Sequence, residues 1–190
     1  MLLCLTVPWA VAKRRYSGDG PHCGRERWEV KELSDDRARD VDFTPKKRTI
    51  AELLTLERVV PRHSEPRRDD EMQTFRVRCA IIKYKLEDDG DLHLVIQDPG
   101  NPSAHMVAEI PDPTCPDAIA GGHAAQFNAA RDMLFELFAE HPPRPRMQSV
   151  DPPPIVEITG VGFYDFPHGQ TGMAPNNLEL HPVLLLKVAH

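Results

Sequence analysis

Prolines divide this chain into stretches that can and cannot pair as central strands. The chain has 190 residues and nineteen prolines, and none of the prolines lies between Pro66 and Pro99. Proline lacks the backbone N–H that a central strand donates to its neighbour. The proline-free stretch therefore predicts the first paired strands, and the proline-rich stretches 99–116, 142–154 and 167–182 predict turns and connections.

Three consecutive antiparallel strands are predicted in and just after the proline-free stretch. Over 75–86, apolar residues alternate with polar or small ones, and the apolar phase changes at Ile82. Such a change of face is typical of a bulge or a sharp bend. The acidic, glycine-containing segment 88–91 predicts a hairpin turn, and alternation predicts further strands over 92–98 and 105–110.

One amphipathic helix is predicted after the third strand. Apolar residues over 117–140 recur with helical periodicity. Asp117 is placed to cap the first turn. Gly121 and Gly122 weaken the start, so the firm part of the helix is expected to begin near His123.

Two long strands, over 155–166 and 178–188, complete the predicted fold. Gly160 and Gly162 predict a bend or bulge in the first of them. The order β-β-β-α-β-β predicts a mainly β (α+β) fold, a small five-stranded OB-like β-barrel over 74–190. An open five-stranded sheet with a helix across it is the alternative.

The N-terminal part of the chain is expected to lie outside the barrel. Residues 1–12 are apolar and end in a small-x-small pattern, which predicts the remnant of a secretory signal peptide; a buried segment is the alternative. Residues 13–73 are predicted to form an irregular arm that ends in a charged linker. Within the arm, 23–31 is predicted to be extended, and a capping box at Thr49 predicts a short helix over 50–58.

The four cysteines bear on how the arm is held. They form no CxxC pair, which disfavours a zinc ribbon. Cys79 lies in a predicted strand and is expected to be a buried free thiol. Cys23 and Cys115 both lie in Gly/Pro-rich loops, where a disulfide between them would tie the arm to the barrel. Two unrelated thiols are the alternative.

The charge distribution limits the partners of the predicted barrel. Residues 75–190 carry eight Lys and Arg against fifteen Asp and Glu. An acidic surface repels phosphate, so non-specific nucleic-acid binding is disfavoured, although the barrel type keeps a single-stranded nucleic-acid binder as an alternative. No apolar run is long enough to span a bilayer. Because residues 1–12 predict a signal remnant, the protein is expected to be secreted or to lie in the cell envelope.

Polar side chains that can carry chemistry gather around the last two strands. The candidate polar site consists of His168, Gln170, Asn176, Asn177, Glu179, His181, His93, Glu109 and Asp165. Glu179 and His181 are two residues apart on one strand and so share a face. Histidine and carboxylate side chains together can hold a divalent metal, which can activate water for hydrolysis. The alternative is that these groups hydrogen-bond the loop backbone and one another.

No other motif indicates catalysis. The serines lie outside a G-x-S-x-G setting, and the glycine pair in the fourth strand is followed by more strand, not by a helix that would bind phosphate. A binding or interaction domain without a catalytic site or cofactor is therefore the expected function. A metal-dependent hydrolase of phosphodiesterase or nuclease type, which would hold a divalent metal, is the alternative.

Several segments together resemble a family of secreted bacterial proteins of unknown function. They are CGRERWEVK, YKLEDDGDLHLVIQD, MVAEIPDPTC and TGVGFYDFPHGQTGMAPNNLELHPVL. The last, with the pattern GxGFxDFxHGQxGxAPNxxELHPV, is the most specific. The resemblance implies export and a cysteine at the positions of Cys23 and Cys115. It implies a complete signal peptide, of which residues 1–12 match only a part, and it adds no catalytic residue.

Overall fold

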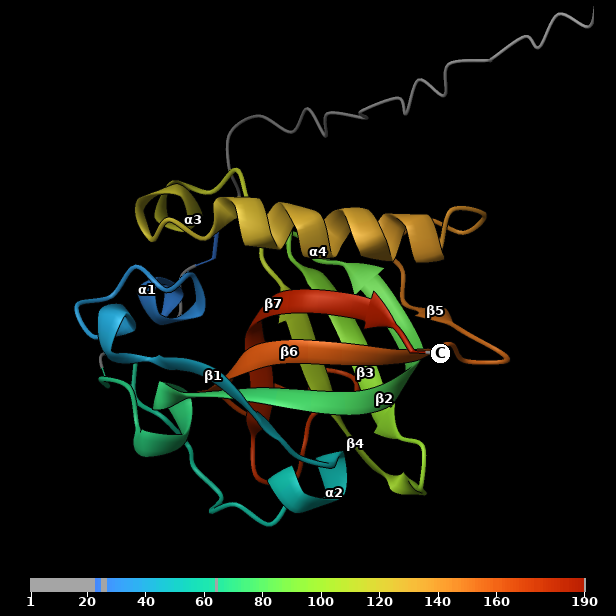
Figure 1. The fold of residues 1–190 in the computed structure, drawn as a ribbon, viewed down its shortest axis with the longest axis horizontal. Helices are drawn as coiled ribbons and strands as arrows, with labels where there is room; N and C mark the ends of the chain where they lie inside the picture. The colour runs from blue at the N-terminus through green and yellow to red at the C-terminus, as the bar shows by residue number, and fades with distance from the viewer. Residues whose placement is uncertain (1–22, 25–26, 64, 190) are drawn as a thin grey trace, which may run out of the picture.

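A ring of hydrogen-bonded strands forms the centre of the molecule (Figure 1). The computed structural model describes residues 23–24, 27–63 and 65–189, so the predicted signal remnant lies outside the described residues. The strands pair in the order β1-β2-β3-β4-β7-β6, β5 pairs with β2, and a further pairing of β2 with β6 closes the ring. The strands are β1 (Asp42–Lys47), β2 (Gln73–Leu86), β3 (Leu92–Asp98), β4 (Asn101–Ile110), β5 (Gln148–Ser149), β6 (Ile155–Tyr164) and β7 (Leu178–Val188).

The predicted mainly β fold is confirmed at the level of the ring. The five ring strands are the five that the alternation of apolar residues predicts, and the main helix lies between the third and the fourth of them. All ring pairs are antiparallel except β4 with β7, which is parallel. The sheet has seven strands and not five, because β1 and β5 add to β2 outside the ring.

The irregularities predicted in the strands are present. The pairing of β2 with β3 shifts register between Ile81 and Lys83, where the apolar phase changes. Gly90 has a φ of 93°, which only glycine adopts readily, and it forms the hairpin turn. The pairing of β6 with β7 shifts at Gly160 and again before Gly162. A Cβ at Gly162 would lie 2.4 Å from a backbone oxygen, so the bend depends on glycine there.

The predicted single helix over 117–140 is two helices. These are α3 (Pro116–Ala120) and α4 (Ala124–Leu137), separated at Gly121-Gly122, where Gly122 has a φ of 79°. The prediction that Asp117 caps the helix was wrong: Cys115 occupies the N-cap position, and Asp117 lies in the first turn. The expectation that the firm helix starts near residue 123 is confirmed.

The main core fills the ring, and helices cover its two ends. α4 crosses one end, and α2 (Ile50–Leu53) lies at the other (Figure 1). α4 contributes Ala130 and Leu134 to the core, and α2 contributes its first and last residues. The capping box at Thr49 is confirmed, but α2 is shorter than the helix predicted over 50–58.

The N-terminal arm packs on the outside of the ring. The prediction that 23–31 is extended was wrong, since Trp28–Lys31 forms the helix α1. Trp28 packs with Val161 and Leu184 in a second, smaller hydrophobic cluster. β1, which the sequence pattern did not predict, pairs in parallel with β2. The arm is therefore part of the folded structure.

The segment predicted to be a charged linker contains buried ion pairs. It includes the short helix η2 (Asp69–Met72), and a further short helix, η1 (Ala38–Asp40), lies in the arm. Arg67 and Glu71 are buried, where a solvated linker was expected. Arg67 binds Asp35 at 2.6 Å. The charges of this segment were misinterpreted because Arg67 and Glu71 pair with Asp35 and Arg27, which lie earlier in the arm.

The cysteine predictions are confirmed. Cys23 and Cys115 form a disulfide, which joins residues 92 positions apart and ties the arm to the start of α3. Cys79 is a buried free thiol, and burial raises the pKa of this thiol above its ordinary range. Among the described residues, no helix has the length and apolar character needed to cross a membrane.

Candidate functional site: a buried histidine–carboxylate cluster

Three neighbouring strands bring four of the predicted site residues to one outer face of the ring. His93 on β3 lies directly opposite Glu109 on β4. β7 runs beside β4, with Glu179 paired to Val107. His181 lies two residues further along β7 and shares the face of Glu179. All four side chains are buried, because the arm and loops cover this outer face.

Glu109 is the centre of the group. Its Oε1 lies 2.8 Å from His93 Nδ1, and its Oε2 lies 3.0 Å from His181 Nδ1. The far nitrogen of His93, Nε2, lies 2.9 Å from the backbone oxygen of Thr171. Because that oxygen only accepts hydrogen bonds, His93 Nε2 carries a proton and donates it.

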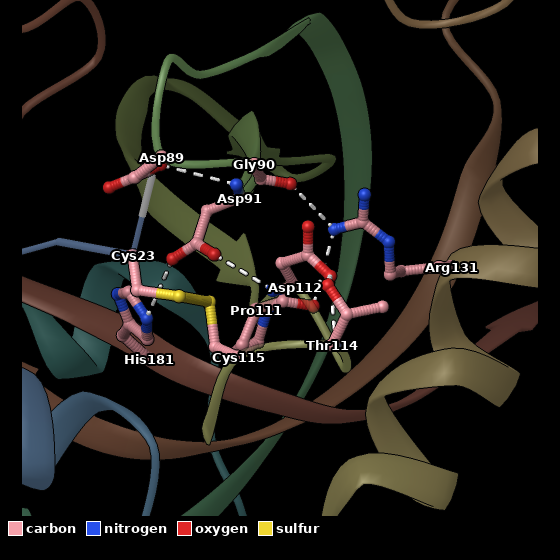
Figure 2. Close-up of a disulfide and its surroundings, with 10 residues drawn as sticks. All are labelled: Cys23, Asp89, Gly90, Asp91, Pro111, Asp112, Thr114, Cys115, Arg131 and His181. Atoms are coloured by element: carbon pink, nitrogen blue, oxygen red, sulfur yellow. Dashed lines mark hydrogen bonds and ion pairs between the residues drawn. A yellow bond between two sulfur atoms is a disulfide. The ribbon is translucent and has the colours of Figure 1, made fainter. Parts of the chain in front are cut away.

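A fifth residue, Asp91, joins from the hairpin turn between β2 and β3 (Figure 2). Its Oδ2 lies 3.5 Å from His181 Nε2. Its Oδ1 accepts a 2.8 Å hydrogen bond from the backbone N–H of Asp112. His181 thus lies between two carboxylates. We call Asp91, His93, Glu109, Glu179 and His181 the histidine–carboxylate cluster.

The arm and one loop cover the cluster. Lys31 of α1 places its Nζ 3.9 Å from Asp165 Oδ1 and 5.4 Å from the centre of the Phe163 ring. Gln170 donates a hydrogen bond from its amide to Glu179 Oε1. Figure 2 shows the disulfide beside His181, close to the turn that carries Asp91. The bridge therefore holds the arm where it covers the cluster.

Opposed charges shift the pKa values at the centre of the cluster. Burial alone would lower the pKa of His181, but the carboxylates of Asp91 and Glu109 outweigh burial and raise it to about 10. Burial would likewise raise the pKa of Glu109, but His181 and His93 outweigh burial and hold it well below its ordinary value. The two carboxylates therefore favour a positive charge at the position of His181, and Glu109 is a carboxylate near neutral pH.

The remaining carboxyl groups shift in the opposite direction. Burial, with repulsion from Glu109, raises the pKa of Glu179 well above its ordinary value. Burial, with repulsion from Asp91, raises the pKa of Glu32 to about 9. Burial would lower the pKa of Lys31, but the surrounding carboxylates outweigh it and raise that pKa. Lys31 thus keeps its charge beside an excess of acidic groups.

The other predicted site residues lie outside the cluster and hold the loop. Asn176 donates to the backbone oxygen of Leu53 at 3.0 Å, and Asn177 donates to that of Val59 at 2.7 Å. Both bonds tie the loop to the arm. His168 lies 2.9 Å from Asp165, and its side chain is 57% exposed, so the structure does not bring it to the metal-capable groups.

Sequence reasoning missed three residues of the site: Asp91, Lys31 and Glu32. Asp91 was explained by its hairpin turn, although four acidic residues between 87 and 91 are more than a turn needs. Lys31 ends a helix of four residues and Glu32 follows it, and such a helix is too short for periodicity to reveal. Their proximity to Cys23 was the available indication, since the predicted disulfide brings this part of the arm to the ring.

Two groups within the described residues have the ligand spacing of a metal site. One is Asp91, Glu109 and His181, and the other is Glu87, His93 and Glu109. In each group one ligand atom per residue lies within 4.8 Å of the others. Both groups share Glu109, so the two sites would compete for its carboxylate.

Comparison with known proteins gives no relative. No protein-family model, no curated protein and no solved structure matches the chain.

Proposed function

We propose that the protein is an exported OB-like domain that binds a ligand or partner, and that the histidine–carboxylate cluster stabilises the fold. The observation that carries this proposal is the covering of the cluster by the arm and the loop. A hydrolytic site must admit a substrate to its reactive groups. Two hollows on the described part of the surface are lined by other residues, away from the cluster.

The ring topology supports the OB-like part of the proposal. A five-stranded Greek-key barrel with a helix between its third and fourth strands requires non-sequential neighbours in the ring. Here β4 neighbours β7 and β6 returns to β2, as such a barrel needs. The disulfide supports export, because such bridges persist in oxidising compartments. The resemblance to secreted proteins agrees with it.

A hollow between the arm and the α3–α4 corner is the best candidate for the binding surface. It has a volume of about 270 Å³ and is lined by Leu33, Ala38, Phe43, Gly121 and His123, among others. The volume is close to the lower end of the range of ligand pockets, roughly 300–1,000 Å³. Phe43 is 42% exposed, and its ring centre lies 5.4 Å from that of His123.

Exposed aromatic rings of this kind are a usual anchor for binding. Aromatic side chains dominate interface energetics because they bury a large, rigid surface. Phe43 and His123 come from the arm and from the N-terminus of α4, so the disulfide that fixes the arm also fixes the hollow. Asp35, Asp36 and Arg39 line the same hollow, which therefore suits an aromatic group that also carries polar substituents.

Ligand-observed NMR with a library of small aromatic compounds tests the proposal. We expect Phe43→Ala to lose binding of the compounds that wild type retains. Phe135→Ala is the matched control, because Phe135 is similarly exposed on α4 but does not line the hollow. Equal binding by wild type and Phe43→Ala would contradict the assignment of the surface.

A metal-dependent hydrolase is the second candidate, favoured by the two metal-capable groups. The full chain, loaded with Zn²⁺ or Mn²⁺, can be assayed on bis(p-nitrophenyl) phosphate and on a single-stranded oligonucleotide. Our proposal predicts no turnover above the level of His181→Gln. Turnover by wild type that His181→Gln abolishes would establish the hydrolase instead.

A further inference from the structure

We infer that Asp91, Glu109 and His181 form a site for one divalent transition-metal cation, which ties the β2–β3 hairpin to β4 and β7. This inference goes beyond the proposed binding function and does not rest on it. The three residues come from three separate segments, so a shared ion would link them as a bridge. One ligand atom of each lies within 4.8 Å of the other two.

The donor set selects the class of cation. Two carboxylates and one imidazole suit Zn²⁺ or Mn²⁺, which accept mixed nitrogen and oxygen ligands. Ca²⁺ and Mg²⁺ prefer oxygen ligands alone. The described part of the cluster also contains no thiolate, since Cys79 lies in the interior of the ring and the other described cysteines are oxidised.

Unpartnered buried atoms point to a ligand independently of the acidic composition. Both ring nitrogens of His181 and the Oδ2 of Asp91 have no hydrogen-bond partner. His181 is 0% exposed and Asp91 is 1% exposed. Buried polar atoms in folded proteins nearly always have a partner. His181 Nε2 and Asp91 Oδ2 lie 3.5 Å apart without a hydrogen bond, which needs an explanation.

Glu109 also approaches His181 closely without forming a hydrogen bond of standard geometry. Glu109 Oε2 lies only 3.0 Å from His181 Nδ1, yet the contact does not have hydrogen-bond geometry. A hydrogen-bond acceptor lies on the N–H axis. An oxygen that shares a cation with the nitrogen lies beside that axis, because the cation occupies it.

The surroundings hold the three ligands in place. Asp91 uses its other oxygen to accept from the backbone N–H of Asp112. Glu109 uses its other oxygen for His93, whose far nitrogen binds the backbone of Thr171. Such outer contacts orient metal ligands and raise their affinity for the ion.

The second metal-capable group, Glu87, His93 and Glu109, has no buried histidine nitrogen without a hydrogen-bond partner. Both nitrogens of His93 have partners within 3.0 Å, so His93 has no free nitrogen for an ion. Glu87 is 26% exposed on its side chain and is available to water. Glu87 therefore provides the matched control, because it is a carboxylate close to Glu109 that the proposed site does not use.

Zinc binding by the full chain with its disulfide intact tests the inference. Chelator-treated protein is dialysed against micromolar Zn²⁺, and bound metal is measured by mass spectrometry. We expect one Zn²⁺ per chain for wild type and Glu87→Gln, and an affinity at least about tenfold weaker for Asp91→Asn, which keeps the shape of the side chain but not its charge. No bound Zn²⁺ in wild type, or equal affinity in Asp91→Asn, would overturn the inference.

X-ray absorption of zinc-loaded wild type keeps the test independent of mutant folding. The expected spectrum has a single imidazole ligand and otherwise oxygen ligands. Sulfur ligation or two imidazoles would assign the ion to another site and overturn the inference. Neither result affects binding at the Phe43 hollow, so the two proposals fail separately.

Discussion

Two buried charged groups of this molecule differ in how completely they are paired. Arg27 and Glu71 meet through two hydrogen bonds of 2.6 and 2.8 Å, and their side chains are almost fully buried. The same carboxylate also accepts from the backbone N–H groups of Tyr164 and Arg68. In the histidine–carboxylate cluster, by contrast, Asp91 Oδ2, Glu179 Oε2 and both ring nitrogens of His181 are buried without a hydrogen-bond partner.

The difference in pairing indicates whether each group can bind a ligand. A carboxylate whose oxygens are all occupied has no capacity left for a ligand, so the pair of Arg27 and Glu71 can only hold the arm to the ring. Unpartnered atoms leave capacity for an ion. Burial and charge alone do not distinguish the two groups; the completeness of pairing does.

Breaking the complete pair is expected to give the largest effect. Glu71→Gln leaves the Arg27 guanidinium buried without its counter-charge, which we expect to lower the free energy of unfolding by about 3–5 kcal/mol. Urea denaturation measures it. The control is Asp40→Asn, whose ion pair with Arg39 is exposed; there we expect less than about 1 kcal/mol. Equal losses in the two variants would contradict the distinction.

Removing the disulfide is expected to loosen the cover of the cluster. The double variant Cys23→Ser, Cys115→Ser should lose about 2–5 kcal/mol of unfolding free energy, because the bridge closes a long loop. Reduced wild type should match the double variant in urea denaturation. A further loss when the variant itself is treated with reductant would show that another thiol is responsible.

Next to the histidine–carboxylate cluster, replacing the unpaired Glu32 is expected to change the free energy of unfolding little. Glu32 is buried and unpaired, and its pKa is raised to about 9. A carboxyl group whose pKa is raised on folding loses stabilisation as the pH rises from its unfolded value, about 4.5, toward 9. Glu32→Gln should therefore be at least as stable as wild type at pH 7.

The pH profile of this variant sharpens the point. We expect the free energy of unfolding of Glu32→Gln to fall less steeply than that of wild type between pH 5 and 9 (about the window set by the two pKa values). Urea midpoints across this window measure the slope. Identical slopes would mean that Glu32 does not titrate in the folded protein as its burial requires.

The smallest effect is expected at the exposed histidine of the loop. His168→Gln should change the free energy of unfolding by less than about 0.5 kcal/mol, because its ion pair with Asp165 is open to solvent on the histidine side. Thermal denaturation with and without Zn²⁺ measures stability and metal response together. A lost zinc response in His168→Gln would place this histidine in the metal site, against the geometry.

Most of the ring could be predicted because apolar and polar residues alternate along a strand that has one buried face. The phase change at Ile82 and the glycines at 160 and 162 marked real irregularities. β1 could not be predicted, because its residues are mostly exposed and show no alternation of apolar and polar side chains. Its pairing with β2 depends on tertiary contacts. Gly121 and Gly122 were predicted to weaken the start of one helix. In the structure they separate α3 from α4.

The site was partly predictable for the same reason. His93, Glu109, Glu179 and His181 were found because each is a polar residue on the outer face of a predicted strand. Their burial was not predictable, because the arm that covers them has no periodic pattern. Asp91 was missed because a hairpin turn already explains an aspartate at that position.

Zinc-dependent thermal stability tests the central claim most directly, namely that the histidine–carboxylate cluster has capacity for a cation that the pair of Arg27 and Glu71 lacks. A cation that binds only the folded chain raises its melting temperature. The account predicts that micromolar Zn²⁺ raises Tm clearly more in wild type and in Glu87→Gln than in Asp91→Asn. An unchanged Tm in wild type, or an equal rise in Asp91→Asn, would contradict it.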